Sequence, residues 1–120
     1  MTEKISVPKI YLDLIDQLFE LERKVETLNE SNTMSRNINR MKDIFANFSS
    51  TGSDVEAGLT YHNPLDEPYN ETRTDLEVSI AGSSTENLLV TEVIKPIIRY
   101  RQGGLTAIVR KGIVVVESRN

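Results

Sequence analysis

Two periodicities of apolar residues divide the chain. In residues 11–48, apolar side chains recur every three or four positions, a spacing typical of amphipathic helices. In residues 76–116, they alternate with polar residues or form short continuous runs, as in β-strands. The chain therefore predicts an α+β fold, with an N-terminal helical stem followed by a small all-β domain of five to six short strands.

The helical pattern contains two series of apolar positions. The first is Tyr11, Leu14, Leu18, Leu21, Val25 and Leu28, and the second is Met34, Ile38, Met41, Phe45 and Phe48. Leu28 and Met34 are six residues apart, one short of a heptad, so the two series do not share a register. Either one long helix is overwound near Asn29–Thr33, or helices 9–28 and 34–48 form an antiparallel hairpin.

Neither helix is stable alone in water at this length, so both need a surface that covers their apolar seams. We expect a homodimer, because the seams are narrow and two-fold dimers are the commonest oligomers. The expected dimerisation residues are Leu14, Leu18, Leu21, Val25, Leu28, Ile38, Met41 and Phe45. A dimer of hairpins would be a four-helix bundle. The alternative is an amphipathic arm that packs on the chain's own β domain.

A segment rich in Ser, Thr, Gly and Asp follows Phe48 and predicts a linker. The expected organisation is a helical dimerisation stem at 1–50, a linker at 51–58 and a small β domain at 59–120. Leu76, Val78 and Ile80 alternate with polar residues and predict a strand with one solvated face.

Further strands are expected near 88–94, 97–101, 105–111 and 113–117. The continuous run Val114–Val116 predicts a central strand covered on both sides. Gly103-Gly104 favours a hairpin turn, and Pro96 interrupts one strand ladder.

Charge is unevenly distributed in this 120-residue chain of net charge −4. Residues 60–92 hold seven carboxylates and one Arg, whereas residues 95–111 hold five basic side chains and no acidic ones. Such a dipolar surface favours a protein partner over nucleic acid.

The chain has no Cys, no basic and apolar leader at its start, and no apolar run long enough to span a membrane. We expect a cytoplasmic protein without membrane contact.

The residues needed for catalysis do not form a recognisable constellation. The single histidine, His62, has no clustered metal-ligand partners, and we interpret it as a loop or strand-end residue. Asp66, Glu67, Glu71 and Asp75 do not match the spacing of a Ca²⁺ loop, so a solvated acidic loop is favoured. A phosphate-binding GxxxxGK[ST] motif is also missing. We expect no enzymatic activity, no metal and no cofactor.

Three stretches carry a family resemblance. Residues 69–75, Tyr-Asn-Glu-Thr-Arg-Thr-Asp, resemble an aromatic-Asp/Asn-Pro-x-x-His-Glu segment. Thr91-Glu92-Val93-Ile94-Lys95 followed by Arg99 resembles a Glu-Val-x-x-x-Gly-Tyr-Arg strand, and residues 110–116 resemble an Arg-Pro-Ala-x-Val-x-Val strand. In this order, over roughly residues 59–117, they resemble the β domain of the GrpE family of nucleotide exchange factors. This chain has Thr74 in place of His, Ile97-Ile98 in place of Gly-Tyr, and Lys111 in place of Pro.

The resemblance implies a function without catalysis. GrpE-like factors dock their β domain on the ATPase domain of a DnaK-type chaperone and promote ADP release. The implied partner-binding residues are Arg99 and Arg110, which match family motifs, with Arg73, Arg101 and Lys111 added because of their location. The competing interpretation is a non-enzymatic coiled-coil adaptor or structural protein that presents a β module to another assembly.

Overall fold

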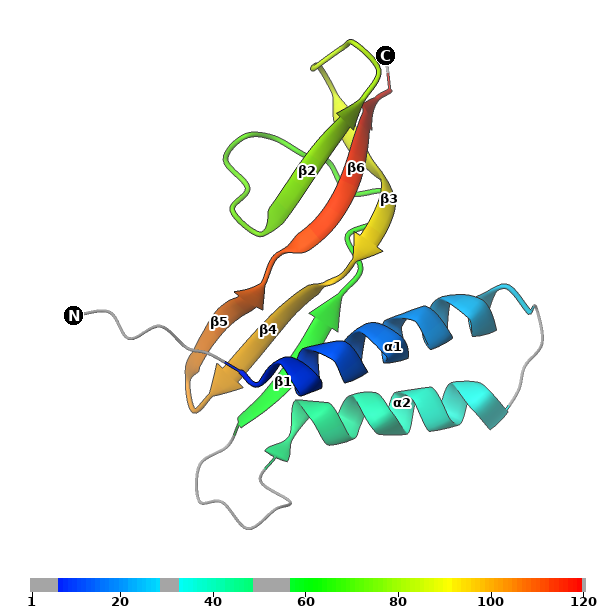
Figure 1. Cartoon of the computed structure of the whole chain (residues 1–120), viewed down its shortest axis with the longest axis vertical. Helices are drawn as coiled ribbons and strands as arrows, with labels where there is room; N and C mark the ends of the chain where they lie inside the picture. The colour runs from blue at the N-terminus through cyan, green and yellow to red at the C-terminus, as the bar shows by residue number, and fades with distance from the viewer. Residues whose placement is uncertain (1–6, 29–32, 49–56, 120) are drawn as a thin grey trace. The chain divides into compact units, whose positions relative to one another are not determined.

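The computed structural model describes residues 7–28, 33–48 and 57–119 (Figure 1). Two helices precede six strands in the chain. They are α1 (Lys9–Glu26), α2 (Thr33–Ala46), β1 (Ala57–His62), β2 (Leu76–Ala81), β3 (Leu88–Lys95), β4 (Ile97–Gln102), β5 (Leu105–Arg110) and β6 (Gly112–Ser118). The chain forms two compact units, which we call the helical unit (1–61 and 99–109) and the strand unit (62–98 and 110–120). The coarse prediction of an α+β fold is confirmed.

The helical unit contains two separate helices that pack against each other. The structure thus has two helices and not one long helix. Residues 27–32 join them, and of these 29–32 lie outside the described part. Each helix ends two residues before its predicted end. The Thr27 hydroxyl donates to the carbonyl of Lys24 at 2.7 Å, a local bond that helps to close the last turn of α1.

A three-stranded sheet, ordered β1-β4-β5, belongs mainly to the helical unit. Strand β1 was not predicted from the apolar pattern. Its first two residues fall inside the predicted linker at 51–58. The other residues of that linker lie outside the described residues. Gly58 allows β1 to approach the end of α2, because a Cβ at this position would lie 1.9 Å from the carbonyl oxygen of Ala46.

The core of the helical unit is formed by one face of α1, the middle of α2 and strand β1. Ile15 and Phe19 of α1 are fully buried, and the Phe19 ring packs edge-on against Tyr61 at a centroid distance of 6.0 Å. Leu18, Val25 and Ile38 form a second buried cluster, on which Met41, Phe45 and Tyr61 pack. The seam residues Leu18, Val25 and Ile38 are therefore buried between helices of the same chain, without a helix from a second chain.

The strand unit is built on a second three-stranded sheet, ordered β2-β6-β3. Strand β6 lies in the centre, parallel to β2 and antiparallel to β3. Val114 and Val116 are buried and Val115 is half-buried, so the predicted central position of the valine run is confirmed. Gly112 opens this strand where a side chain would not fit, since a Cβ there would lie 2.9 Å from Ile97 Cγ1.

The five strands predicted after residue 75 are all present, within two residues of their predicted bounds. They are divided between two sheets, because the chain passes from one sheet to the other at Pro96 and back again at Lys111. Pro96 is fully buried and has no N–H to donate, so a continuous ladder cannot pass through it. The predicted boundary separated helices at 1–50 from strands at 59–120. The compact units do not follow this boundary, because the helices belong to the same unit as β1 and most of β4 and β5.

Candidate docking surface

The five predicted partner-binding residues are divided between the two units. Arg73, Arg110 and Lys111 belong to the strand unit, and Arg99 and Arg101 belong to the helical unit. That all five act on one partner stays a prediction.

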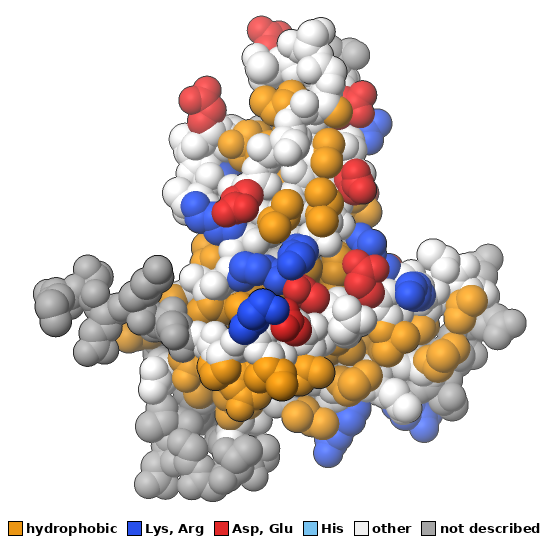
Figure 2. All heavy atoms as spheres, viewed as in Figure 1, with side chains coloured by type: hydrophobic (Ala, Val, Ile, Leu, Met, Phe, Trp, Pro, Cys, Tyr) orange, Lys and Arg blue, Asp and Glu red, His pale blue; other side chains and the backbone are white. Residues whose placement is uncertain are grey.

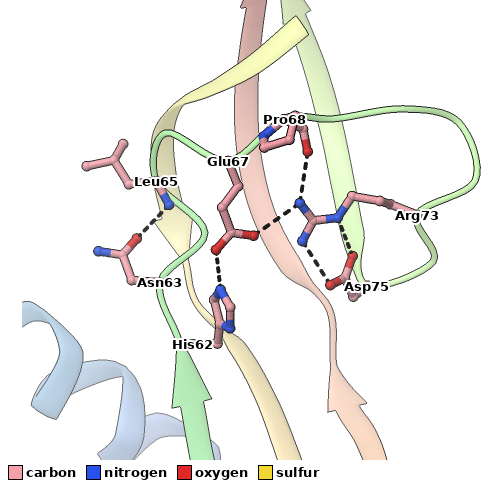
Figure 3. A network of polar contacts seen from close by, with 7 residues as sticks. All are labelled: His62, Asn63, Leu65, Glu67, Pro68, Arg73 and Asp75. Carbon is pink, nitrogen blue, oxygen red and sulfur yellow. Dashed lines mark hydrogen bonds and ion pairs between the residues drawn. The ribbon is translucent and has the colours of Figure 1, made fainter.

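Arg73 is the centre of a polar network in the loop before β2 (Figure 3). Its Nε and Nη2 atoms donate to the two carboxylate oxygens of Asp75 at 3.0 and 2.9 Å, a bidentate pair. Nη1 donates to the carbonyl of Pro68 at 3.1 Å and lies 3.2 Å from Glu67 Oε1. The Arg73 and Asp75 side chains are only 19% and 17% exposed, so this pair is shielded from solvent.

The hydrogen bond to Asp75 raises the pKa of Arg73 above its usual value, so the guanidinium is charged at any physiological pH. Glu67 extends the network, because its second oxygen contacts Nε2 of His62. The predicted loop histidine thus has one carboxylate neighbour, at the point where β1 ends. These contacts connect the two ends of the acidic loop 62–75 to its middle. The loop carboxylates Glu67 and Asp75 are paired with basic side chains.

Asp75 also links this loop to the basic stretch before β6. Its carbonyl oxygen accepts a hydrogen bond from the backbone N–H of Gly112 at 3.0 Å, which places Lys111 near the Arg73 network. Arg110 Nη2 donates to the carbonyl of Pro96 at 3.0 Å and is half-buried. The Lys111 side chain is exposed. Arg73, Arg110 and Lys111 therefore bring positive charge to one region of the strand unit.

The two basic residues of the helical unit lie on β4. Arg101 Nη2 donates to the carbonyl of Ala46 at 3.2 Å, where it satisfies a backbone acceptor at the C-terminus of α2 and complements the helix dipole. Arg99 is half-buried. Arg101 thus has an intramolecular role at the end of a helix, in addition to any role in docking.

The predicted dimerisation residues fall into two groups. Leu18, Val25 and Ile38 are buried within the chain, and Met41 and Phe45 are half-buried against them. By contrast, Leu14 and Leu21 are 50% and 42% exposed, and Leu28 is 51% exposed. Ile10 and Met34 are further large apolar side chains that are exposed on these helices. Figure 2 shows hydrophobic side chains gathered along the two helices.

Sequence reasoning missed a polar cluster that joins both helices to β1. Glu22 of α1 accepts hydrogen bonds from the Tyr61 hydroxyl at 2.8 Å and from Lys42 Nζ at 3.1 Å. Lys42 also lies over the Tyr61 ring, 5.2 Å from its centroid. Burial and the Glu22 carboxylate raise the pKa of Tyr61 well above its usual range. Glu22 and Tyr61 are 39 residues apart, so no local pattern signals the contact.

The stretch at 69–71 that contributes to the family resemblance lines a shallow cleft of about 490 Å³ in the strand unit. The cleft is lined by Pro68, Tyr69, Asn70, Glu71, Thr85, Asn87, Leu88, Leu89 and Arg119. Within the described ranges, no three His, Asp or Glu side chains are grouped so that they could hold a metal ion. Neither of the described helices is long and apolar enough to cross a bilayer.

Comparisons with protein-family models, with curated proteins and with solved structures find no significant match to this chain. The family resemblance therefore depends on the three stretches alone. In the structure, two of them are neighbours in one sheet. Strand β3 holds Thr91–Lys95, strand β6 begins within 110–116, and the two strands pair antiparallel with Val93 opposite Val114.

Proposed function

We propose that this protein is a GrpE-like nucleotide exchange factor, which promotes ADP release from a DnaK-type chaperone without catalytic side chains of its own. The observation that carries the proposal is the pairing of two family-like stretches in one sheet, with Glu92 opposite Val115. The third stretch, at 69–75, leads directly into β2 of that same sheet. Stretches that are separate in the sequence thus belong to one structural module.

The mechanism requires only differential binding. A factor that binds the open form of the ATPase domain more tightly than the closed form shifts the domain toward opening, and bound ADP leaves faster. A thousandfold preference corresponds to about 4 kcal/mol. In this proposal Arg73, Arg110 and Lys111 supply the docking charge of the strand unit.

Lys111 is the best residue for a test of docking, because its side chain is exposed. We expect the wild-type protein to accelerate release of a fluorescent ADP analogue from a DnaK-type ATPase domain in stopped-flow measurements. Lys111→Glu should reduce that acceleration about tenfold, since charge reversal in a docking surface acts on association as well as affinity. Lys24→Glu, at an exposed position of α1, makes the same change in net charge and serves as the control.

No acceleration with any DnaK-type chaperone from the same organism would refute the exchange proposal. Equal losses for Lys111→Glu and Lys24→Glu would show that net charge, and not a docking surface, governs the rate.

The proposal includes a homodimer formed through the exposed apolar side chains of α1. Leu14→Asp with Leu21→Asp places two charges at exposed positions and leaves the buried cluster around Leu18 intact. We expect this double variant to be monomeric in sedimentation at micromolar concentration, with an unchanged helix signal in circular dichroism. Asn37→Asp with Asn39→Asp adds the same charge at exposed polar positions of α2 and should not affect assembly. A monomeric wild-type protein would contradict the dimer.

A further inference from the structure

The outer edge of strand β2 has the features of a strand-binding site. Strand β2 stands at one side of the β2-β6-β3 sheet, and its six residues pair with β6 in an unbroken register from Leu76–Gly112 to Ala81–Glu117. Among the described residues, no strand pairs with its other side and no backbone hydrogen bond reaches it. Unpaired N–H and C=O groups along a regular edge form a template for an added strand.

The opposite edge of the same sheet is protected by three devices. The loop segment 66–69 covers the start of β3, with Tyr69 N–H donating to Leu88 C=O and Val90 N–H donating to Glu67 C=O, each at 2.9 Å. Two register shifts interrupt the pairing of β3 with β6, and Pro96 follows the strand directly. Natural sheets use coverage, bulges and proline in this way to prevent further pairing. Strand β2 has an unbroken register and no proline, and no segment among the described residues is hydrogen-bonded along its outer edge.

The side chains of β2 indicate what an added strand would look like. Val78 and Ile80 lie on the same face as the buried Val114 and Val116 of β6, yet the Ile80 side chain is 46% exposed. An added strand with an apolar side chain on this face would cover it.

The other face of β2 is polar and acidic. It carries Glu77 and Ser79, and Glu117 of β6 lies beside Ala81 on this face. Glu77 and Glu117 are exposed, and they are the only charged residues in β2 and in the paired stretch 112–117. Residues 76–94 contain three carboxylates, Glu77, Glu86 and Glu92, and no basic side chain. A partner strand therefore gains from basic residues on this face.

We propose that β2 binds an extended segment of a partner protein as a fourth strand of this sheet, and that the segment alternates apolar residues with Lys or Arg. Main-chain hydrogen bonds to β2 provide affinity, the apolar residues cover Ile80, and the basic residues lie beside Glu77, with Glu117 farther away on β6. A second copy of this chain fits the edge less well, because pairing of β2 with β2 brings two acidic edges together. The proposal is independent of the exchange function and goes beyond it.

The probe is an acetylated, amidated heptapeptide in which Lys alternates with Val, labelled for fluorescence anisotropy and titrated onto the full chain at 0.15 M salt. Two further peptides carry N-methyl groups on alternate amides, one in each of the two possible phases. An added strand uses only one phase of its N–H groups toward its neighbour. We expect one N-methylated peptide to lose binding and the other to retain it, while a peptide with Glu in place of Lys does not bind.

A matched pair of variants locates the site on the protein. Glu77→Lys should weaken binding of the Lys–Val peptide about fivefold or more, because it reverses an exposed charge next to the added strand. Glu92→Lys makes the same change of charge on β3, two strands away in the same sheet, where an effect of at most about twofold is expected since screening acts over about 8 Å. Hydrogen exchange should slow at amides of β2 when the peptide is bound.

Three results would overturn the proposal. Equal binding of all N-methylated peptides would show that no strand is added. Equal weakening by Glu77→Lys and Glu92→Lys would identify non-specific attraction by the acidic surface. Self-association of the wild-type chain that protects β2 amides from exchange would make a second copy the occupant of this edge.

Discussion

Gly58 provides the sharpest test of how the helical unit is packed. A Cβ at this position would lie 1.9 Å from the carbonyl oxygen and 2.3 Å from the carbonyl carbon of Ala46. Both distances are well below 3.0 Å, and real Cβ atoms essentially never come closer than 3.0 Å to another heavy atom. The obstacle is backbone at the end of α2, so no side-chain rotation relieves it. Gly58→Ala therefore requires β1 and α2 to separate by about 1 Å or more.

The expected effect follows from that displacement. Overpacking of a dense core usually costs 1–3 kcal/mol, and we expect about 3 kcal/mol here because backbone must move. The φ of Gly58 is not in the left-handed region, so the loss is steric and not conformational. Urea unfolding monitored by far-ultraviolet circular dichroism measures the change in free energy of unfolding.

Two other glycines are matched controls in the same chain. A Cβ added at Gly104 would have no atom of the described residues within 4 Å. Gly104→Ala should therefore change the free energy of unfolding by less than about 0.5 kcal/mol. A Cβ at Gly112 would lie 2.9 Å from Ile97 Cγ1 and 3.0 Å from Leu76 Cδ2, which are side-chain atoms of buried residues and not backbone, so an intermediate loss of about 1–2 kcal/mol is expected for Gly112→Ala. If Gly58→Ala were as stable as Gly104→Ala, the close approach of β1 to α2 would be refuted.

Three further substitutions test the packing and the polar clusters. Leu59→Ala removes a buried side chain and should lower the free energy of unfolding by about 2–5 kcal/mol in the same urea assay; a loss below about 1 kcal/mol would contradict its burial. The raised pKa of Tyr61 means that the folded state favours the neutral phenol. The contribution of this hydroxyl to the free energy of unfolding is complete below the unfolded pKa of about 10 and is lost as the pH rises above it. Tyr61→Phe should therefore weaken the loss of stability seen between about pH 10 and 12 in alkaline denaturation curves, and an unchanged curve would exclude the hydroxyl of Tyr61 as a cause. Arg73→Lys keeps the charge but cannot form the bidentate pair with Asp75, so we expect thermal unfolding to report a loss of about 1–2 kcal/mol; wild-type stability would show that the pair contributes nothing.

The strands could be predicted because their signals are local. Alternation from Leu76 to Ile80 and the breaks at Pro96 and Gly112 are visible in a few residues each, and the observed bounds follow them. The exception is β1, a short strand of mixed residues that follows a run of Ser, Gly and Asp. Its Tyr61 is half-buried against residues far away in the chain, among them Phe19 of α1, which is 42 positions earlier.

The buried face of α1 could not be chosen from periodicity alone. A spacing of 3.5 residues favours Leu14, Leu18 and Leu21 as one seam, but the structure buries Ile15, Leu18 and Phe19. Ile15 and Phe19 stand one position after Leu14 and Leu18, so the helix has two overlapping apolar stripes. Which stripe is covered depends on contacts with residues far away in the chain, including Tyr61. The stripe that remains exposed is the one we propose as the dimer contact.

The candidate docking residues show a similar limit. The pairing of Arg73 with Asp75 involves residues two positions apart and lies within reach of sequence reasoning, whereas the bond from Arg101 to the end of α2 spans 55 positions. A cluster of basic residues in a sequence predicts charge, but it does not distinguish a guanidinium that faces a partner from one that closes a helix. The structure makes this distinction for each residue separately.

This distinction decides how a loss of docking can be interpreted. Arg73, Arg101 and Arg110 each donate to a backbone carbonyl of their own unit, so their replacement removes internal hydrogen bonds together with any contact to a partner. A variant that releases a buried acceptor costs stability and lowers activity even if the surface is not used. Lys111 is exposed, and its substitution acts mainly through surface charge. A docking role is therefore established for this module only if Lys111 contributes to it, and losses at the three arginines support that role only in variants whose stability is unchanged.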